Sequence, residues 1–87
     1  MILSQTSQFK KDVKRMRKRG ADLDKLKKII QQLLSGEELD ERHRDHALSG
    51  NWSGRRDCHI QPDWLLIYRR DAEELRLERT GSHSDLF

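Results

Sequence analysis

Apolar residues in the first half of the chain recur at the spacing of a helical face. Phe9, Val13 and Met16 are separated by four and three residues, so they share one side of a helix. Thr6 or Ser7 can cap the start of this helix, because a side-chain hydroxyl accepts a hydrogen bond from a free N–H of the first turn. The pattern therefore predicts an amphipathic helix that begins near residue 7.

A second helix is expected between two glycines. Gly20 suits the left-handed conformation that often follows a helix, Asp22 can cap the next helix, and Gly36 can end it. The apolar stripe of this helix is broader than that of the first and consists of Leu23, Leu26, Ile29, Ile30, Leu33 and Leu34. The tight Gly20-Ala21 link predicts an antiparallel helical hairpin.

In the second half of the chain the period of the pattern changes to two, as in strands. Residues 56–61 place Cys58 and Ile60 on one face and Asp57 and His59 on the other. The remaining expected elements are short strands at 2–6, 64–68 and 75–79, turns at 62–63 and 71–74, a helical turn near 40–44, and a C-terminal turn capped by Ser82.

The order β-α-α-β-β-β predicts a single α+β domain over residues 1–87. In this arrangement the N-terminal strand and the helical hairpin pack on one face of a small antiparallel sheet. We expect the other face of the sheet to be partly open and to carry His59 and Trp64.

The distribution of charge favours a polyanionic partner. Lys and Arg number 18 against 15 Asp and Glu, but residues 10–19 contain seven basic groups and only one acidic group. Such a cluster attracts nucleic acid, although an ordinary solvated helix face has the same composition. The basic residues are Lys10, Lys11, Lys14, Arg15, Arg17, Lys18 and Arg19.

Several classes of protein are disfavoured by the sequence. The single Cys58 excludes an internal disulfide and fits a reducing cytosol, and no apolar run approaches the ~20 residues that span a bilayer. The first residues lack the pattern of a signal peptide, so we expect a cytoplasmic protein. The possible zinc ligands His43, His46, Cys58 and His59 lack a metal-binding motif, and we expect neither a metal nor a cofactor.

Histidines are the strongest candidates for chemistry, because imidazole gives and takes protons near neutral pH. His46, His59 and His83 could converge with the turn residue Asp63, although a lone surface histidine usually has no catalytic role. RNA cleavage requires such a group of side chains. One group takes the proton of the 2′-hydroxyl, another protonates the departing 5′-oxygen, and a cation stabilises the charge on phosphorus.

Two further side chains fit an RNA site. If Trp64 is exposed, it can stack on an unpaired base, although it could also be ordinary core. Arg79 has the strand parity of Leu75 and Leu77, so simple alternation would bury it. Because a buried unpaired guanidinium is too costly, Arg79 must meet a carboxylate, lie at a strand end or face a bound anion.

Three segments together resemble the YafQ branch of the RelE/ParE toxin superfamily: residues 45–52 (DHALSGNW), 56–68 (RDCHIQPDWLLIY) and 77–87 (LERTGSHSDLF). The resemblance implies a RelE-like fold and a toxin of a type II toxin–antitoxin pair. Such a toxin enters the ribosomal A site and cuts mRNA there, and an antitoxin protein silences it. DNA would be contacted only indirectly, through the antitoxin.

The resemblance also implies a set of site residues. The family's catalytic positions fall on His46, His59, Asp63 and His83, with Asp63 as general base and His83 as general acid. Accessory substrate-binding positions fall on Trp64, Arg79 and Phe87. The basic first helix would then grip ribosomal RNA through its phosphates. The alternatives are a non-catalytic nucleic-acid-binding module and a protein-interaction module, in which the histidines are incidental.

Overall fold

The computed structural model describes residues 1–87 and confirms an α+β fold. Its helices and strands are β1 (Ile2–Gln5), α1 (Ser7–Lys18), α2 (Leu23–Leu34), β2 (His46–Ala47), β3 (Arg56–Gln61), β4 (Trp64–Arg70), β5 (Glu74–Gly81) and α3 (His83–Leu86). Two short 3₁₀ turns, η1 (Glu41–His43) and η2 (Gly50–Trp52), lie in the polar segment between α2 and β3.

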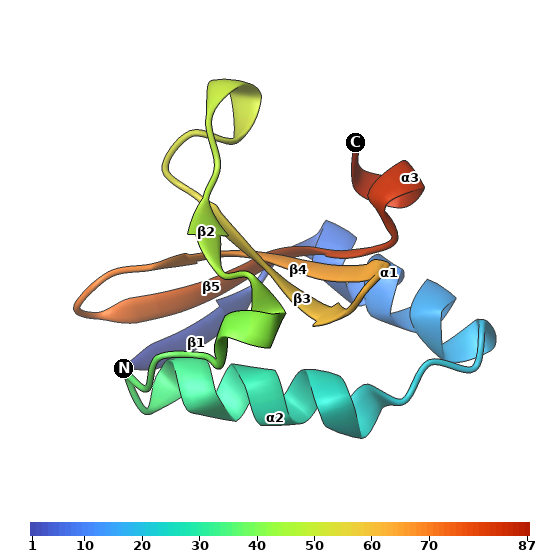
Figure 1. The fold of residues 1–87 in the computed structure, drawn as a ribbon, viewed down its shortest axis with the longest axis horizontal. Helices are drawn as coiled ribbons and strands as arrows, with labels where there is room; N and C mark the ends of the chain where they lie inside the picture. Colours follow the sequence, from blue (N-terminus) through green and yellow to red (C-terminus); the bar gives the residue numbers. More distant parts are fainter.

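The sheet has five strands in the order β1-β5-β4-β3-β2 and is mixed (Figure 1). Strands β2 to β5 pair antiparallel, as expected, but β1 runs parallel to β5 and pairs Ile2 with Glu74. The expectation of a purely antiparallel sheet is therefore wrong for the first strand. Parallel neighbours need a long connection between them, and nearly the whole chain separates β1 from β5. The two-residue strand β2 was not predicted.

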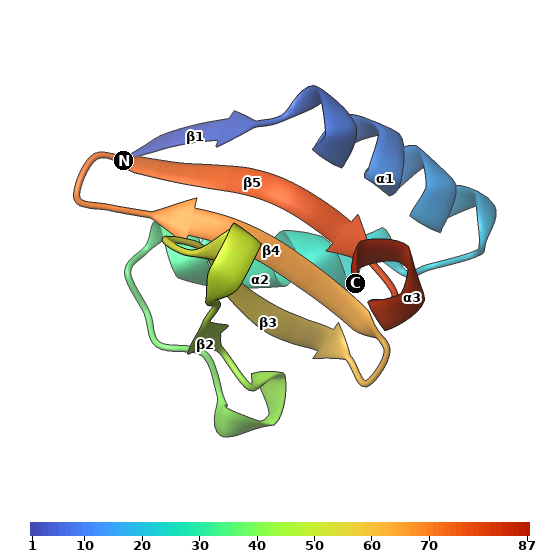
Figure 2. The ribbon, with the colours of Figure 1, turned by 90° about the horizontal axis from the view of Figure 1, so that it is seen from above.

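The helices cover one face of the sheet, as the apolar stripes predict. Thr6 caps α1 by accepting from the Phe9 N–H at 2.9 Å, and Asp22 caps α2 by accepting from the Asp24 N–H at 3.1 Å. Helix α1 packs along β5 and α2 lies across β3 (Figure 2). The main core between helices and sheet consists of Phe9, Met16, Leu26, Ile29, Leu33, Cys58, Ile60, Trp64, Leu66, Tyr68, Leu75 and Leu77.

The other face of the sheet is only partly covered. Leu65 and Ile67 of β4 point to this side and are buried beneath Leu86 of α3, with Leu48 and Trp52 packed against them. The rest of this face is where β2 and β3 present their polar side chains. The expectation of a partly open face is therefore confirmed, but Trp64 does not lie on it.

A β-bulge explains why His59 and Trp64 face opposite sides. The register shifts between His59 and Gln61, so Gln61 pairs with Trp64 while His59 pairs with Leu65. Regular pairing after a two-residue turn would instead place His59 opposite Leu66, on the side of the helices. Because one extra residue reverses the direction of the side chains, the bulge turns His59 towards the open face.

Candidate active site

The open face gathers the predicted catalytic residues from three parts of the chain. Register pairs His46 of β2 with Asp57 of β3, and His83 begins the short helix that directly follows β5. The rings of His59 and His83 meet edge to face, with their centroids 5.4 Å apart. Asp63, in the turn between β3 and β4, contacts His83. The four residues therefore belong to one cluster.

Asp63 holds His83 through two hydrogen bonds. Its Oδ1 accepts from the backbone N–H of His83 at 3.0 Å and from the ring Nδ1–H at 2.7 Å. The backbone bond, and then the ring bond, lower the pKa of Asp63 below its usual value, so this carboxylate is a weak base. A ring that donates from Nδ1 presents Nε2 to solvent and substrate.

His59 is the histidine whose protonation the fold changes most clearly. Partial burial lowers the pKa of His59 because the charged ring loses solvation, and the nearby charge of Asp57 opposes this shift only in part. The lowered pKa of His59 favours the neutral form of its ring. A neutral imidazole gives the site a proton acceptor.

His46 is oriented by backbone and carboxylate oxygens. Its Nδ1–H donates to the carbonyl of Arg44 at 2.6 Å and lies 3.4 Å from Oδ1 of Asp57. Asp57 is only 4% exposed, and this oxygen makes no hydrogen bond. Burial raises the pKa of Asp57, while the charges of His46 and His59 act in the opposite direction.

Asp57 was not proposed as a site residue from the sequence. The signal was available, because strand alternation had already placed Asp57 on the same face as His59. A buried carboxylate with an unpaired oxygen is costly, and such groups are concentrated at functional sites. The cluster therefore contains three imidazoles and two carboxylates.

Arg79 meets a carboxylate, one of the three alternatives left open by the sequence. Its Nε and Nη2 donate to the two oxygens of Asp12 on α1 at 2.7 and 3.2 Å. A register shift in the pairing of β4 with β5 sets Arg79 opposite Ile67, on the face of the sheet that carries the histidine cluster. Simple alternation would have placed Arg79 on the same face as Leu77, so this prediction from the strand pattern is wrong. Whether Arg79 also binds substrate stays a prediction.

Two of the seven basic residues in the first helical segment have partners within the chain. Arg15 lies 3.1 Å from Asp12 and 3.7 Å from Asp85, and Arg19 contacts both oxygens of Asp85 at 2.6 and 3.1 Å. Arg15 and Arg19 thus connect α1 to α3, and whether they also bind RNA stays a prediction. The residues that remain exposed without such ties are Lys10, Lys11, Lys14, Arg17 and Lys18.

Asp85 connects these arginines to the histidine cluster. Its side chain accepts from the Ser82 N–H at 2.9 Å, while the Ser82 hydroxyl accepts from the Asp85 N–H, so the two residues form a capping box at the start of α3. The bidentate contact with Arg19 is the main reason why the pKa of Asp85 lies far below its usual value. Helix α3, which carries His83, is thereby fixed to α1.

The predicted accessory aromatic residues differ in exposure. Phe87 is 60% exposed and meets Trp52 edge to face at 6.3 Å, so it remains available to substrate. Trp64 is only 2% exposed, and its Nε1–H donates to the Thr80 hydroxyl at 2.9 Å within the core. The expectation that Trp64 stacks on a base is wrong, because the bulge in β3 leaves this ring on the side of the helices.

The structure contains no group of three or more histidine, cysteine, aspartate or glutamate side chains arranged to hold a metal ion. Cys58 is buried on the helix side of β3, and burial strongly raises the pKa of its thiol. No helix is long and apolar enough to cross a membrane.

These features define a class: a small α+β domain with an acid–base cluster on the open face of its sheet and a cationic helix at its edge. The family model for the "Bacterial toxin of type II toxin-antitoxin system, YafQ" matches residues 1–87. The chain therefore belongs to the YafQ family of type II toxins.

Individual relatives agree with this assignment. The chain is 45% identical over 83 residues to "mRNA interferase toxin YafQ" of Escherichia coli K12, which covers 94% of this chain and 90% of the relative. The crystal structure of YafQ from E. coli BL21(DE3) superposes with a TM-score of 0.95 at 42% identity, covering 98% of this chain and 96% of the other.

Two further solved structures include a partner or a metal. The E. coli DinJ–YafQ complex contains a chain that matches with a TM-score of 0.92 at 43% identity, covering 98% of this chain and 96% of that one. A copper-bound L66S mutant toxin from Helicobacter pylori matches with a TM-score of 0.94 at 41% identity, covering 100% of this chain and 99% of that one.

Proposed function

We propose that this toxin is a ribosome-dependent endoribonuclease that cleaves mRNA by metal-free acid–base catalysis. Membership of the toxin family and 45% identity to a curated mRNA interferase support the cleavage of mRNA. The observation that carries the mechanism is the contact of His59 with His83, whose ring Asp63 holds at 2.7 Å. Ribonucleolytic cleavage needs one proton acceptor and one proton donor within hydrogen-bonding reach of the reacting oxygens.

The proton transfers are assigned by the environment of each group. His59, neutral because of its lowered pKa, removes the 2′-hydroxyl proton, and the 2′-oxygen attacks the adjacent phosphorus. His83 acts as an imidazolium whose Nδ1–H is held by Asp63, and it gives its Nε2 proton to the 5′-oxygen as the bond from phosphorus to that oxygen breaks, leaving a 2′,3′-cyclic phosphate and a 5′-hydroxyl. In this proposal Asp63 positions the ring of His83, in place of the role of general base that the family resemblance implies, because its Oδ1 already accepts two hydrogen bonds and its pKa is lowered.

His46 and Arg79 complete the proposed site. His46 lies beside Asp57 and contributes charge and position. Arg79 has five N–H donors, and Asp12 engages only two of its nitrogen atoms, so the guanidinium can still stabilise negative charge on the phosphoryl oxygens. Phe87 is the aromatic residue that remains exposed for contact with a base.

We also propose two partners. The exposed lysines and Arg17 of α1 would bind ribosomal RNA through phosphate contacts that carry no sequence information. An antitoxin would silence the toxin, as the solved DinJ–YafQ complex suggests, by covering the basic α1 and an edge of the sheet. Because the ribosome is the target, the toxin would act in the cytoplasm.

Cleavage of a defined mRNA on purified ribosomes tests this proposal. We expect cleavage by the wild-type chain only when ribosomes are present, and loss of cleavage in His83→Ala. A chelator selective for transition metals should leave the rate unchanged at constant magnesium. Restoration of a chelated enzyme by copper or zinc would overturn the metal-free mechanism, and RNA binding without any product would leave only a binding module.

A further inference from the structure

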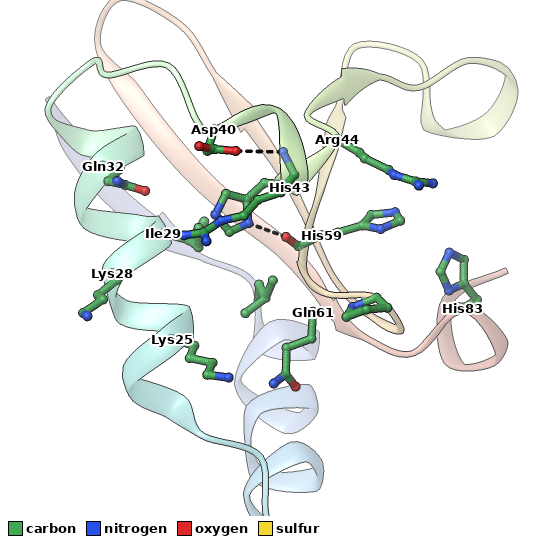
Figure 3. A pocket seen from close by; sticks show the side chains of 13 residues that line it. Lys25, Lys28, Ile29, Gln32, Asp40, His43, Arg44, His59, Gln61 and His83 are labelled. Carbon is green, nitrogen blue, oxygen red and sulfur yellow. Dashed lines mark hydrogen bonds between the residues drawn. The ribbon is translucent and has the colours of Figure 1, made fainter.

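A second feature of the molecule is a groove of about 880 Å³ between α2, the η1 segment and the turn that joins β3 to β4 (Figure 3). Its size lies in the upper part of the range usual for ligand sites. Lys25 and Lys28 line the groove from α2, and Arg42 and Arg44 line it from the opposite side. The proposed function makes no use of these four cations.

The charge of the groove is not balanced by the protein. Asp40 is the only acidic residue in its lining, and Oδ1 of Asp40 accepts from the backbone N–H of Arg42 as an N-cap. None of the four cations forms a salt bridge within the chain, in contrast to Arg15 and Arg19. The groove is therefore complementary to a polyanion.

The groove is continuous with the catalytic cluster. His59 and His83 are among the residues that line the groove (Figure 3), so an RNA strand whose phosphodiester lay between these rings would continue into it. His43 connects the two regions, because its Nδ1–H donates to the carbonyl of His59 at 2.7 Å. This bond fixes η1 against β3 and leaves Nε2 of a neutral His43 as a hydrogen-bond acceptor.

We propose that this groove binds the single-stranded RNA that leads away from the scissile phosphodiester. Lys25, Lys28, Arg42 and Arg44 bind its sugar-phosphate backbone, while His43 and Gln61 offer hydrogen-bonding groups to the edge of one unpaired base. Unpaired RNA is the form whose bases are open to such contacts. The inference rests on the proposed function, since it assigns the neighbouring subsite of the same substrate.

Binding of a short 2′-O-methyl RNA, which lacks the attacking hydroxyl and cannot be cleaved, tests the groove directly. In ¹⁵N NMR spectra of the wild-type chain we expect shifts of Gln32, Arg44 and Gln61 in addition to residues near His83. Lys25→Ala combined with Lys28→Ala should weaken binding about tenfold and reduce the slope of log K against log salt by about 1.4, because each phosphate contact to single-stranded RNA contributes about 0.7.

Lys27→Ala is the matched control, because Lys27 is exposed on the same helix but does not line the groove. It should bind the RNA as the wild type does. Lys27→Ala removes one charge and the double variant removes two. A slope change about half as large in Lys27→Ala would therefore mean that only the overall charge of α2 matters, and would overturn the groove. Shifts confined to residues near His83, or no binding by the wild type, would also overturn it.

Cleavage on ribosomes separates the failure of this inference from failure of the proposed function. If the groove proposal and the proposed function are both correct, the double variant has a raised KM and a smaller decrease in kcat, whereas His83→Ala abolishes turnover. If the double variant cleaves normally while the wild type is active, the groove proposal fails and the nuclease stands. If the double variant cleaves normally but no longer binds the antitoxin, the groove is a protein-binding surface instead.

Discussion

The Oδ1 atom of Asp63 accepts hydrogen bonds from both the backbone N–H and the ring Nδ1–H of His83, residues that lie twenty positions apart. The two bonds fix the position of the helix start and the orientation of the ring together. A carboxylate that orients an imidazole also stabilises the imidazolium that forms during proton transfer. The contact therefore holds the turn between β3 and β4 in a fixed position relative to α3.

Asp63→Asn should reduce kcat about a hundredfold, within the range usual for general acid–base catalysis. The oxygen of the asparagine side chain can still accept the backbone N–H of His83. However, the negative charge is lost, and the NH₂ group of the asparagine can take the place of the oxygen beside Nδ1 of His83. Because Asp63 is exposed, the thermal midpoint should remain unchanged, which is checked by circular dichroism. Wild-type rates in this variant would show that His83 does not need its carboxylate.

The local parts of this fold could be predicted from the sequence, and the long-range parts could not. Helical spacing and the Thr6 and Asp22 caps fixed α1 and α2, because caps and apolar stripes act within a few residues. The parallel pairing of β1 depends on contacts between strands that are distant in the sequence. The bulge after His59 depends on how β3 pairs with β4, and it reversed the side assigned to Trp64. For the same reason the ties of Arg15 and Arg19 to Asp85 could not be read from composition.

The dependence of cleavage on pH should reflect the environment of His59. If His59 is the base, kcat/KM falls on the acid side as this ring becomes protonated. Burial lowers the pKa of His59, so the midpoint of the acid limb should lie below the 6.5 of an ordinary histidine. A pH–rate profile at concentrations of the ribosome–mRNA complex well below KM measures it. An acid limb centred above 6.5 would contradict the assignment of His59 as the base.

Trp64→Phe should lower stability without affecting the chemistry. The change removes an indole N–H that donates to Thr80 and leaves a small void in the core, which together cost roughly 1–3 kcal/mol of the free energy of unfolding. Urea denaturation measures this loss, and cleavage at a temperature where the variant is folded should match the wild type. A second experiment uses Trp52→Phe, in which Trp64 is the remaining tryptophan. The fluorescence of Trp64 should not change when RNA is added, whereas a base stacked on Trp64 would quench it.

Arg19→Ala should loosen α3 and thereby displace His83. The bidentate contact of Arg19 with Asp85 is lost, while the capping box of Ser82 and Asp85 remains. A small misplacement of a catalytic group lowers rates substantially, so we expect kcat to fall between about tenfold and a hundredfold. Hydrogen exchange of the amides of residues 85–87 should become faster. Lys18→Ala is the control, because Lys18 is exposed and forms no ion pair, and its α3 amides should exchange as in the wild type.

Asp57→Asn should stabilise the fold and impair the active site. Burial raises the pKa of Asp57 above its value in the unfolded chain, so the folded state binds more protons and stability falls as the pH rises through that interval. At neutral pH the buried carboxylate, with Oδ1 unpaired, therefore costs free energy, and the amide should raise the free energy of unfolding by about 1 kcal/mol.

The same substitution removes the negative charge that raises the pKa of His59, so the acid limb of kcat/KM should move to still lower pH. It also removes the charged neighbour of His46, and kcat should fall even though the protein is more stable. Denaturation and pH–rate profiles of the same preparation measure both effects. A variant that is less stable at neutral pH and keeps the wild-type acid limb would show that Asp57 serves the fold and not the site.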